Sequence, residues 1–275
     1  MTGSMINVQI NEQNRSVPDG LTVGSLRDQE RPSADVLVVN GFPCGPDTEV
    51  KEGDQVVFIR RGETPKEEEL ESLMVARHTP GVHSRMKGSA VGVAGLGGLG
   101  SNVAVALVRM GIGTLILADF DLVEPSNLNR QQYSIEHIGM PKTDAMTQIL
   151  LDINPYTRVI THDVSLDRNN IPQIFQNVDV IVECLDRAEA KAMFIQTVLE
   201  LLPETYIIGA SGLAGYGDSN NIQSIRLGEK IFMVGDLVTP AEPGRGLMAP
   251  RVGIAAHHQA NLVVSLLMDS EKAAL

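Results

Sequence analysis

The sequence of 275 residues predicts an α/β fold with a doubly wound, mainly parallel sheet, preceded by a small α+β domain. Two observations predict this fold class. Strand and helix patterns alternate from Ser89 onward, and the chain before Gly62 contains short strands with a single helical segment. We therefore expect a small domain over residues 1–62, a linker helix and loop over 63–88, and a larger domain over 89–275.

Short strands and turns dominate the first of these parts. Apolar and polar residues alternate from Ile6 to Ile10, which is the period of a strand. A short helix is expected up to Gln29, with Thr22 as its N-cap. Further apolar strands are expected at residues 36–40 and 56–59.

The linker carries the signals of one helix. Pro65 suits a first helical position, and the acidic run that follows it favours the positive end of the helix dipole. We expect this helix to end before Pro80 and Gly81, which form a turn signal. His78 and His83 flank that signal and are interpreted as loop residues.

The larger domain shows the alternation most clearly, and such alternation implies a parallel sheet covered on both faces. Strands are expected at residues 90–94, 114–118, 178–182 and 206–208, and helices at 99–110, 141–153 and 188–202.

Composition limits the possible functions. The chain has 22 Lys and Arg against 34 Asp and Glu, a net charge of −12, so it is a poor candidate for non-specific binding to nucleic acid or anionic lipid. Two cysteines exclude a disulfide scaffold and an all-cysteine zinc site. The sequence shows no apolar run long enough to span a membrane and no leader. We expect a cytoplasmic protein with no membrane or nucleic-acid partner.

A glycine-rich turn follows the first strand of the larger domain and opens its first helix. It contains Gly95, Gly97, Gly98 and Gly100, in the pattern of a Rossmann-like dinucleotide fold. Glycines let the backbone approach a phosphate, and the helix N-terminus supplies unpaired N–H groups. Asp119, at the end of the next strand, can accept hydrogen bonds from ribose hydroxyls. Taken alone, this pair of signals predicts a nicotinamide-dependent oxidoreductase.

Three further side chains point to ATP. Arg130 and Lys142 lie in segments that meet the carboxyl edge of the sheet, where they can neutralise a triphosphate. Asp186 follows another strand at that edge, and a carboxylate there suits Mg²⁺ held jointly with phosphate oxygens. The alternative for Asp186 is that it caps the following helix.

Together these pieces carry a resemblance. The sequence from about residue 75 to 270 resembles the adenylating domain of ubiquitin-activating enzymes, of the ThiF-type sulfur-carrier adenylyltransferases of thiamine biosynthesis and of the molybdopterin-synthase adenylyltransferases. The matching pieces are Gly95–Gly100, Ala118–Asp121, Ser126–Gln131, Pro141-Lys142, Ile153–Pro155 and Asp186. Residues 1–62 resemble ThiS-like sulfur carriers, which have the ubiquitin-like β-grasp fold.

The resemblance implies that the protein binds ATP and Mg²⁺ and joins AMP to the C-terminal carboxylate of a ubiquitin-like sulfur carrier with a Gly-Gly end. It also implies a homodimer, and a role in thiamine synthesis is expected. Arg130, Lys142 and Asp186 would be the catalytic residues, with Asp186 on Mg²⁺. The nucleotide-binding residues carried over are Gly95, Gly97, Gly98, Gly100, Asp119, Asp121, Ser126, Asn127, Arg130, Gln131, Lys142 and Asp186. Arg77 is the candidate for an arginine lent across a dimer.

The sequence also departs from these families. It lacks the paired Cys-x-x-Cys motifs of many relatives, so we expect no zinc. No cysteine follows Cys184, which is interpreted as a packed thiol, so no sulfur-handling step is expected on this chain. The ThiS-like part runs on through Arg60 to Glu63 instead of ending in a free glycine. We therefore expect it to be a docking or assembly element.

Three other functions stay open at this point. The chain could activate a different acyl group, such as one on a modified tRNA nucleoside. It could be a nicotinamide-dependent oxidoreductase, although Arg130, Lys142 and Asp186 would then have no role. It could also be a non-catalytic scaffold that keeps the nucleotide-binding fold.

Overall fold

The computed structural model describes residues 4–78 and 80–268. The chain divides into two compact units, Met1–Pro80 and Gly81–Leu275. Each unit has its own sheet and its own hydrophobic core. In the second unit, most of the core lies between the sheet and the helices on one face, and a second cluster lies under the helices of the other face.

The first unit is built on one five-stranded sheet with the order β2-β1-β5-β3-β4. The hairpin β1–β2 is antiparallel, and β1 also pairs with the last strand, β5, in parallel. Helix α1, Val23–Glu30, covers this sheet, and Thr22 Oγ1 accepts a hydrogen bond from the Ser25 amide at 3.2 Å, so the expected N-cap is confirmed. The strands are β1 Met5–Ile10, β2 Gln13–Pro18, β3 Val36–Val39, β4 Phe42–Pro43 and β5 Gln55–Ile59.

A core of buried side chains joins the sheet to α1. Val8, Leu26 and Phe58 are its centre and are almost completely buried. A hairpin, one helix and a last strand between the first and third strands form the expected β-grasp arrangement.

Helix α2, Glu67–His78, also belongs to the first unit. Glu69 forms an ion pair with Arg31 and accepts a hydrogen bond from the Asn11 side-chain amide at 2.9 Å. Glu63, before the helix, lies 3.6 Å from the same arginine. The expected linker helix is therefore present and is tied to the sheet that precedes it.

The second unit contains a seven-stranded sheet with the order β11-β12-β10-β9-β6-β7-β8. All neighbouring strands are parallel except the edge strand β11, which is antiparallel to β12. The mainly parallel, doubly wound sheet is thus confirmed. The strands are β6 Ala90–Ala94, β7 Thr114–Asp119, β8 Arg158–Asp163, β9 Val180–Glu183, β10 Tyr206–Ala210, β11 Gln223–Arg226 and β12 Ile231–Gly235.

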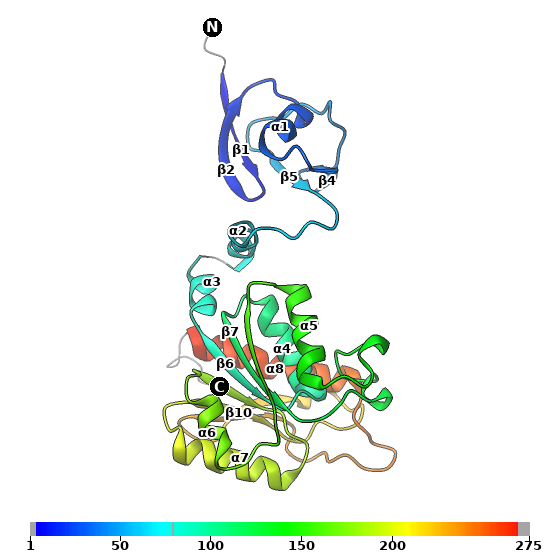
Figure 1. The fold of residues 1–275 in the computed structure, drawn as a ribbon, viewed down its shortest axis with the longest axis vertical. Coiled ribbons are helices and arrows are strands. Elements are labelled where there is room, and N and C mark those ends of the chain that lie inside the picture. The colour runs from blue at the N-terminus through cyan, green and yellow to red at the C-terminus, as the bar shows by residue number, and fades with distance from the viewer. Residues whose placement is uncertain (1–3, 79, 269–275) are drawn as a thin grey trace. The chain divides into compact units, whose positions relative to one another are not determined.

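Helices cover both faces of this sheet (Figure 1). Helices α4, α5 and α8 pack together on one face, and α6 and α7 lie on the other. Because both faces are covered, the central strands are apolar on both sides, as a parallel sheet requires. The helices are α3 Pro80–Lys87, α4 Gly98–Arg109, α5 Lys142–Ile153, α6 Asn170–Phe175, α7 Ala188–Leu201 and α8 Ala249–Met268, with short 3₁₀ turns at Pro125–Asn127, Ile135–His137 and Ser219–Asn221.

The chain order of the strands creates a switch point between β6 and β9. From β6 the chain crosses through α4 to β7 on one side, whereas β9 pairs with β6 on the other side. In open α/β sheets, ligands bind in the crevice beyond the carboxyl ends of two such strands. The segments that follow β6 and β9 therefore border the crevice in which a ligand is expected.

Some elements differ from the sequence-based expectation. The Pro80-Gly81 pair begins helix α3 instead of forming a turn, and His83 lies buried in that helix, so the interpretation of this histidine as a loop residue was wrong. Strands β8, β11 and β12 and helix α6 were not predicted.

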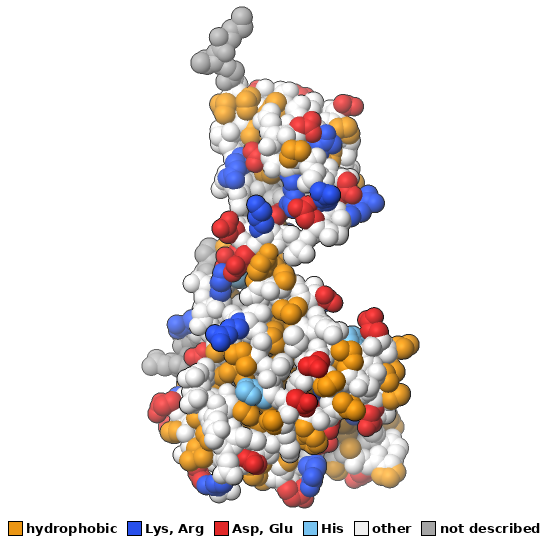
Figure 2. All heavy atoms as spheres, viewed as in Figure 1, with side chains coloured by type: hydrophobic (Ala, Val, Ile, Leu, Met, Phe, Trp, Pro, Cys, Tyr) orange, Lys and Arg blue, Asp and Glu red, His pale blue; other side chains and the backbone are white. Residues whose placement is uncertain are grey.

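The surface is mixed in charge. Figure 2 shows the basic side chains of the second unit scattered on the face in view, with acidic and apolar side chains between them. Within the described part of the chain, none of the helices combines the length and the apolar character that crossing a membrane requires.

Candidate nucleotide-binding site

The turn from Gly95 to Gly100 is shaped by close backbone contacts. Gly95 has φ +91°, and a Cβ there would lie 2.8 Å from the Cys184 carbonyl oxygen. A Cβ on Gly100 would collide with the Gly95 carbonyl. These two glycines are therefore required by the turn itself, and they hold it against the segment that follows β9.

The two glycines between them have a different environment. Gly97 is the N-cap of α4, and a Cβ on it would meet nothing within 4 Å. A Cβ on Gly98 would lie 3.0 Å from Cγ1 of Val252 and 3.4 Å from Cγ of Arg130, so the backbone is open at Gly97 and closely packed at Gly98. The start of α4 thus offers open backbone with the aliphatic part of an arginine against it, which fits the approach of an anionic group.

Asp119 ties the end of β7 to the glycine turn. Its Oδ2 accepts a hydrogen bond from the Leu96 amide at 2.6 Å, and its Oδ1 accepts one from the Asp121 amide at 2.8 Å. Burial raises the pKa of this carboxyl group, and the charge of Lys142 acts in the opposite direction. Each oxygen keeps a second lone pair, so the ribose-binding role expected of Asp119 is compatible with these bonds.

Tyr133 holds the same turn from the other side, and sequence reasoning missed it. Its hydroxyl donates to the Leu96 carbonyl at 2.9 Å. Burial raises the pKa of this phenol, and the charges of Asp119 and Asp121 raise it further, so the group stays a neutral donor. Nothing in the residue pattern of the sequence marked this tyrosine, because the contact spans 37 residues.

Lys142 begins α5 and is nearly buried, with 7% of its side chain exposed. Its Nζ lies 2.7 Å from Oδ2 of Asp121, whose side chain is 51% exposed. The backbones of the same two residues are joined by a hydrogen bond of 2.9 Å. The lysine is therefore held beside Asp119 and Asp121, at the carboxyl end of β7.

Arg130 ends the segment that begins at Ser126. Its Nη1 donates to Asn129 Oδ1 at 2.7 Å and to the Ser126 carbonyl at 3.3 Å. Its buried Nε has no hydrogen-bond partner among the described residues, and neither has Oε1 of the buried Gln131. Such unsatisfied buried polar atoms are uncommon in folded proteins and call for a physical explanation.

Two predicted contacts in this segment serve the fold in the structure. Asn127 is buried, and its Oδ1 accepts a hydrogen bond from the Glu124 amide at 3.0 Å. Ser126 is exposed, and its hydroxyl lies 3.2 Å from a carboxylate oxygen of Glu124. Both side chains shape the turn that carries Arg130.

Asp186 lies in the short loop between β9 and α7. It is exposed and makes no hydrogen bond or ion pair with any other described residue. The N-cap of α7 is Arg187, without a side-chain bond, so the alternative of Asp186 as a helix cap is not supported. Since Gly95 lies against the Cys184 carbonyl, this loop and the glycine turn meet at the switch point of the sheet.

Sequence reasoning also missed an ion pair below this loop, between a buried carboxylate and a lysine whose side chain is 23% exposed. Glu183, the last residue of β9, is completely buried, and Lys191 Nζ lies 3.0 Å from each of its carboxylate oxygens. Burial raises the pKa of Glu183, while Lys191 and the Leu185 amide act in the opposite direction.

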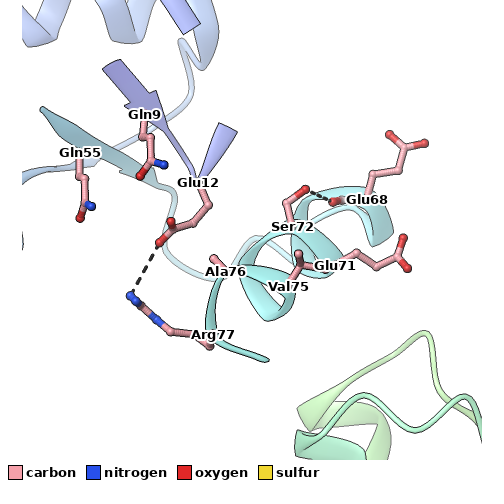
Figure 3. Close-up of a pocket in the computed structure, with 9 residues that line it drawn as sticks. All are labelled: Gln9, Glu12, Gln55, Glu68, Glu71, Ser72, Val75, Ala76 and Arg77. Atoms are coloured by element: carbon pink, nitrogen blue, oxygen red, sulfur yellow. Dashed lines mark hydrogen bonds and ion pairs between the residues drawn. The ribbon is translucent and has the colours of Figure 1, made fainter. Parts of the chain in front are cut away.

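Arg77 is not among the side chains that the second unit brings together. It lies in α2 of the first unit, where it is 79% exposed and pairs with Glu12 at 3.7 Å (Figure 3). The cavity in Figure 3 is lined from the same unit, by β1, β5 and α2.

The donor set limits the metals that fit. Among the described residues, no group of three or more His, Cys, Asp or Glu side chains is arranged to hold a metal ion. Cys184 is buried, and burial raises the pKa of its thiol, which agrees with a packed side chain. Asp186 is a single open carboxylate, which fits Mg²⁺ shared with phosphate oxygens.

Comparisons with known proteins agree with this geometry. The family model of ThiF matches residues 71–273, and that of the ThiS-like ubiquitin domain matches residues 6–62. The chain is 36% identical over 147 residues to adenylyltransferase and sulfurtransferase UBA4 of Candida glabrata, which is 52% of this chain and 34% of that protein. It is 33% identical over 159 residues to ubiquitin-like modifier-activating enzyme 5 of Aedes aegypti, 54% of this chain and 39% of that protein. The chain thus spans about a third of the length of these curated relatives.

Solved structures show the same fold. The E. coli tRNA N6-threonylcarbamoyladenosine dehydratase TcdA, solved in complex with ATP, has a TM-score of 0.64 at 20% identity and covers 71% of this chain and 92% of its own. E. coli MccB, solved with MccA-N7isoASN, has a TM-score of 0.55 at 22% identity and covers 70% of this chain and 61% of its own.

Proposed function

Because the chain belongs to the ThiF family, we propose that it is an ATP-dependent adenylyltransferase that activates the C-terminal carboxylate of a ubiquitin-like sulfur carrier. The observation that carries this proposal is the meeting of open glycine backbone with Arg130 at the switch point of the sheet. The names of the matched relatives, an adenylyltransferase and a modifier-activating enzyme, support the same class of reaction.

Each charged side chain has a role in this proposal. Arg130 and Lys142 bind phosphate oxygens, and Asp119 binds the ribose. Gly97 and Gly98 let the backbone amides of α4 approach the nucleotide, since no side chain fills the space at Gly97. Lys142 keeps Asp121 as its counter-ion until the phosphates arrive.

The reaction needs no nucleophile from this chain. A carboxylate oxygen of the carrier attacks the α-phosphorus of ATP in line, the new O–P bond forms, and the bond to the β-phosphate oxygen breaks. Pyrophosphate leaves with its electron pair, and an acyl adenylate is the other product. Mg²⁺ held between Asp186 and the phosphates would supply charge neutralisation for the leaving group. The contribution of the protein is positioning and electrostatic stabilisation.

Pyrophosphate exchange tests the residues directly. One well-placed cation is worth about 10²–10³ in rate, so Arg130→Ala is expected to lower carrier-dependent ATP–pyrophosphate exchange by that factor. Asp186→Ala is expected to lower it comparably. Arg109→Ala and Glu189→Ala are the matched controls, because both residues are exposed on helices of the same unit. A variant with near-normal exchange would remove its residue from the proposed machinery.

A thermal-shift experiment separates this proposal from an oxidoreductase. A ligand at 100 times its dissociation constant stabilises a protein by ~2.7 kcal/mol. We expect stabilisation by ATP with Mg²⁺ and none by NAD at the same concentration. Stabilisation by NAD alone would favour the oxidoreductase, in which Arg130, Lys142 and Asp186 have no assigned role.

The finer assignments belong to the same proposal. We infer a carrier with a Gly-Gly end, a homodimer and a place in thiamine synthesis, with Arg77 as the side chain lent between subunits. The ThiS-like module would dock or assemble and would not itself be adenylated, since the chain continues from Arg61 through Glu63 into α2. If ATP–pyrophosphate exchange required tRNA in place of a protein carrier, the result would favour the alternative function, activation of an acyl group on a tRNA nucleoside.

A further inference from the structure

Glu183 is a buried carboxylate for which the proposed reaction has no use. It is the last residue of β9 and is completely inaccessible to solvent. Its register partner in the sheet is Ala94, the residue directly before the glycine turn. A charged group at this position is therefore located beneath the proposed nucleotide site.

Two donors bind the carboxylate, and one backbone carbonyl accepts from the cation that neutralises it. Lys191 Nζ lies 3.0 Å from both oxygens of Glu183, and the Leu185 amide donates to Oε1 at 2.7 Å. The same Nζ donates to the Ala210 carbonyl, at the end of β10, at 3.2 Å. Gly209 leaves room for the group, because a Cβ there would lie 3.3 Å from Oε2.

These bonds bring four parts of the second unit together. They join the carboxyl ends of β9 and β10 to the first turn of α7 and to the loop between β9 and α7. We call Glu183 and Lys191 the clamp. Asp186 lies in the clamped loop and has no side-chain partner of its own among the described residues. Its direction is therefore set by the backbone of the loop, which the clamp holds.

Stability alone is a weak reason for such a pair. Buried ion pairs can often be replaced by apolar residues without loss of stability, because desolvation offsets their attraction. Lys191 also lies near the positive end of the dipole of α7, which is unfavourable for a cation. A Glu–Lys pair has no net charge, so the clamp can fix the position of the loop without adding charge beside a polyphosphate. This role gives a reason for the pair that stability does not.

We propose that the Glu183–Lys191 clamp is a positioning device that aims Asp186 and thereby sets the affinity for metal-bound ATP, as distinct from ATP without metal. This inference rests on the proposed function, since it assumes that Asp186 holds Mg²⁺. Glu183 and Lys191 are positioning residues in this proposal, because it assigns neither of them a contact with the nucleotide.

The first test is calorimetric binding of ATP to the full chain, with Mg²⁺ and with EDTA. Substituting a residue that orients a metal ligand without binding the metal itself typically lowers the metal affinity by about 10–100-fold. Lys191→Met is expected to weaken binding of ATP with Mg²⁺ by at least about tenfold and to leave binding in EDTA within about twofold. Glu189→Gln is the matched control, since it removes one charge from the same turn of α7. Equal losses in both conditions, or no loss, would overturn the proposal.

Two further variants keep the test decisive. Lys191→Arg is expected to restore much of the affinity, and adding Lys191→Met to Asp186→Ala is expected to produce no further loss. An equal loss in the Asp186→Ala background would show that the clamp does not act through Asp186. If Lys191→Met does not fold, Glu183→Gln with Lys191→Met replaces it, because that pair leaves no unpaired buried charge.

Hydrogen exchange gives a readout without nucleotide. The Leu185 amide is expected to exchange faster in Lys191→Met than in the wild type and to be unchanged in Glu189→Gln. Unchanged exchange would overturn the clamp. A wild-type protein that binds no ATP would instead refute the proposed function, whereas a wild type that binds ATP with Mg²⁺ no better than Lys191→Met would refute the clamp alone.

Discussion

At the residue scale, Leu96 is the best-held part of the glycine turn. Asp119 accepts from its amide and Tyr133 donates to its carbonyl, so both backbone polar groups of this residue are satisfied by side chains. Glycines increase the conformational freedom of the backbone in this turn, and the hydrogen bonds to these two side chains restrict it. The turn is therefore held in one shape by the protein's own side chains.

Tyr133→Phe tests the hydrogen bond from the Tyr133 hydroxyl to the Leu96 carbonyl. The substitution leaves a buried carbonyl without its donor, which costs about 1–3 kcal/mol. We expect the free energy of unfolding in urea to fall by that amount and the affinity for ATP to fall with it. Tyr216→Phe is the control, because Tyr216 is 82% exposed. Equal stability of the two variants would show that the bond to Leu96 contributes nothing.

Residue types and their order allowed charged residues to be proposed for the site, and they could not reveal the side chains that support it. Gly95, Arg130 and Asp186 follow recognisable motifs, because a phosphate needs these chemical groups at this edge of a sheet. Tyr133 and Lys191 act through buried contacts whose partners are chosen by the fold. Such contacts can be recognised only in the folded structure.

At the element scale, several hydrogen bonds in the loop between β12 and α8 converge on one carboxylate, whose side chain is 10% exposed. Asp236 accepts hydrogen bonds from the Thr239 hydroxyl and amide at 2.6 and 2.8 Å and pairs with Arg251 at 2.8 Å. Burial by itself raises the pKa of Asp236, but these bonds and one from the Val238 amide outweigh it and lower the pKa below its usual 3.8. The folded loop therefore favours the ionised form.

The pH dependence of stability follows from this shift. A carboxyl group whose pKa is lowered by folding stabilises the protein above its unfolded pKa, and that stability is lost as the pH falls through the folded pKa. We expect Asp236→Asn to be less stable than the wild type at pH 7, by about 1–2 kcal/mol. The difference should shrink as the pH falls from about 5 to 3. Urea unfolding at a series of pH values measures it, and a constant difference would contradict the assignment.

Elements with strong periodicity were the predictable ones. The central strands β6, β7 and β9 are continuous apolar runs, since both of their faces are buried. Strands β8 and β11 were missed because they are edge strands with mostly half-exposed or exposed residues, so no long apolar run marks them. Helix α3 was missed because its first residues, Pro80 and Gly81, usually signal a turn.

At the scale of the whole molecule, the chain consists of two units with separate cores. Arg31, at the C-cap of α1, pairs with Glu69 of α2 and with Glu63 before it, and the first unit extends to Pro80. A cut at residue 62 would therefore leave α2 without the partners that hold it. A deletion of residues 1–80 removes a complete unit.

That deletion separates nucleotide binding from carrier recognition. Because every proposed nucleotide contact except Arg77 lies in the second unit, we expect the protein without residues 1–80 to bind ATP within about twofold of the full chain. Its affinity for the carrier, measured by carrier-dependent pyrophosphate exchange, is expected to fall. Unchanged exchange kinetics and unchanged assembly would remove the ThiS-like module from both roles.

The peptide connection between the two units has one more consequence. A module tethered through a short chain meets its neighbour at an effective concentration in the millimolar range, however dilute the protein is. If the ThiS-like module occupies the surface that a free carrier uses, every incoming carrier competes with the tethered module for that surface. Only a carrier that binds tightly or is present at high concentration would then displace the module and reach ATP.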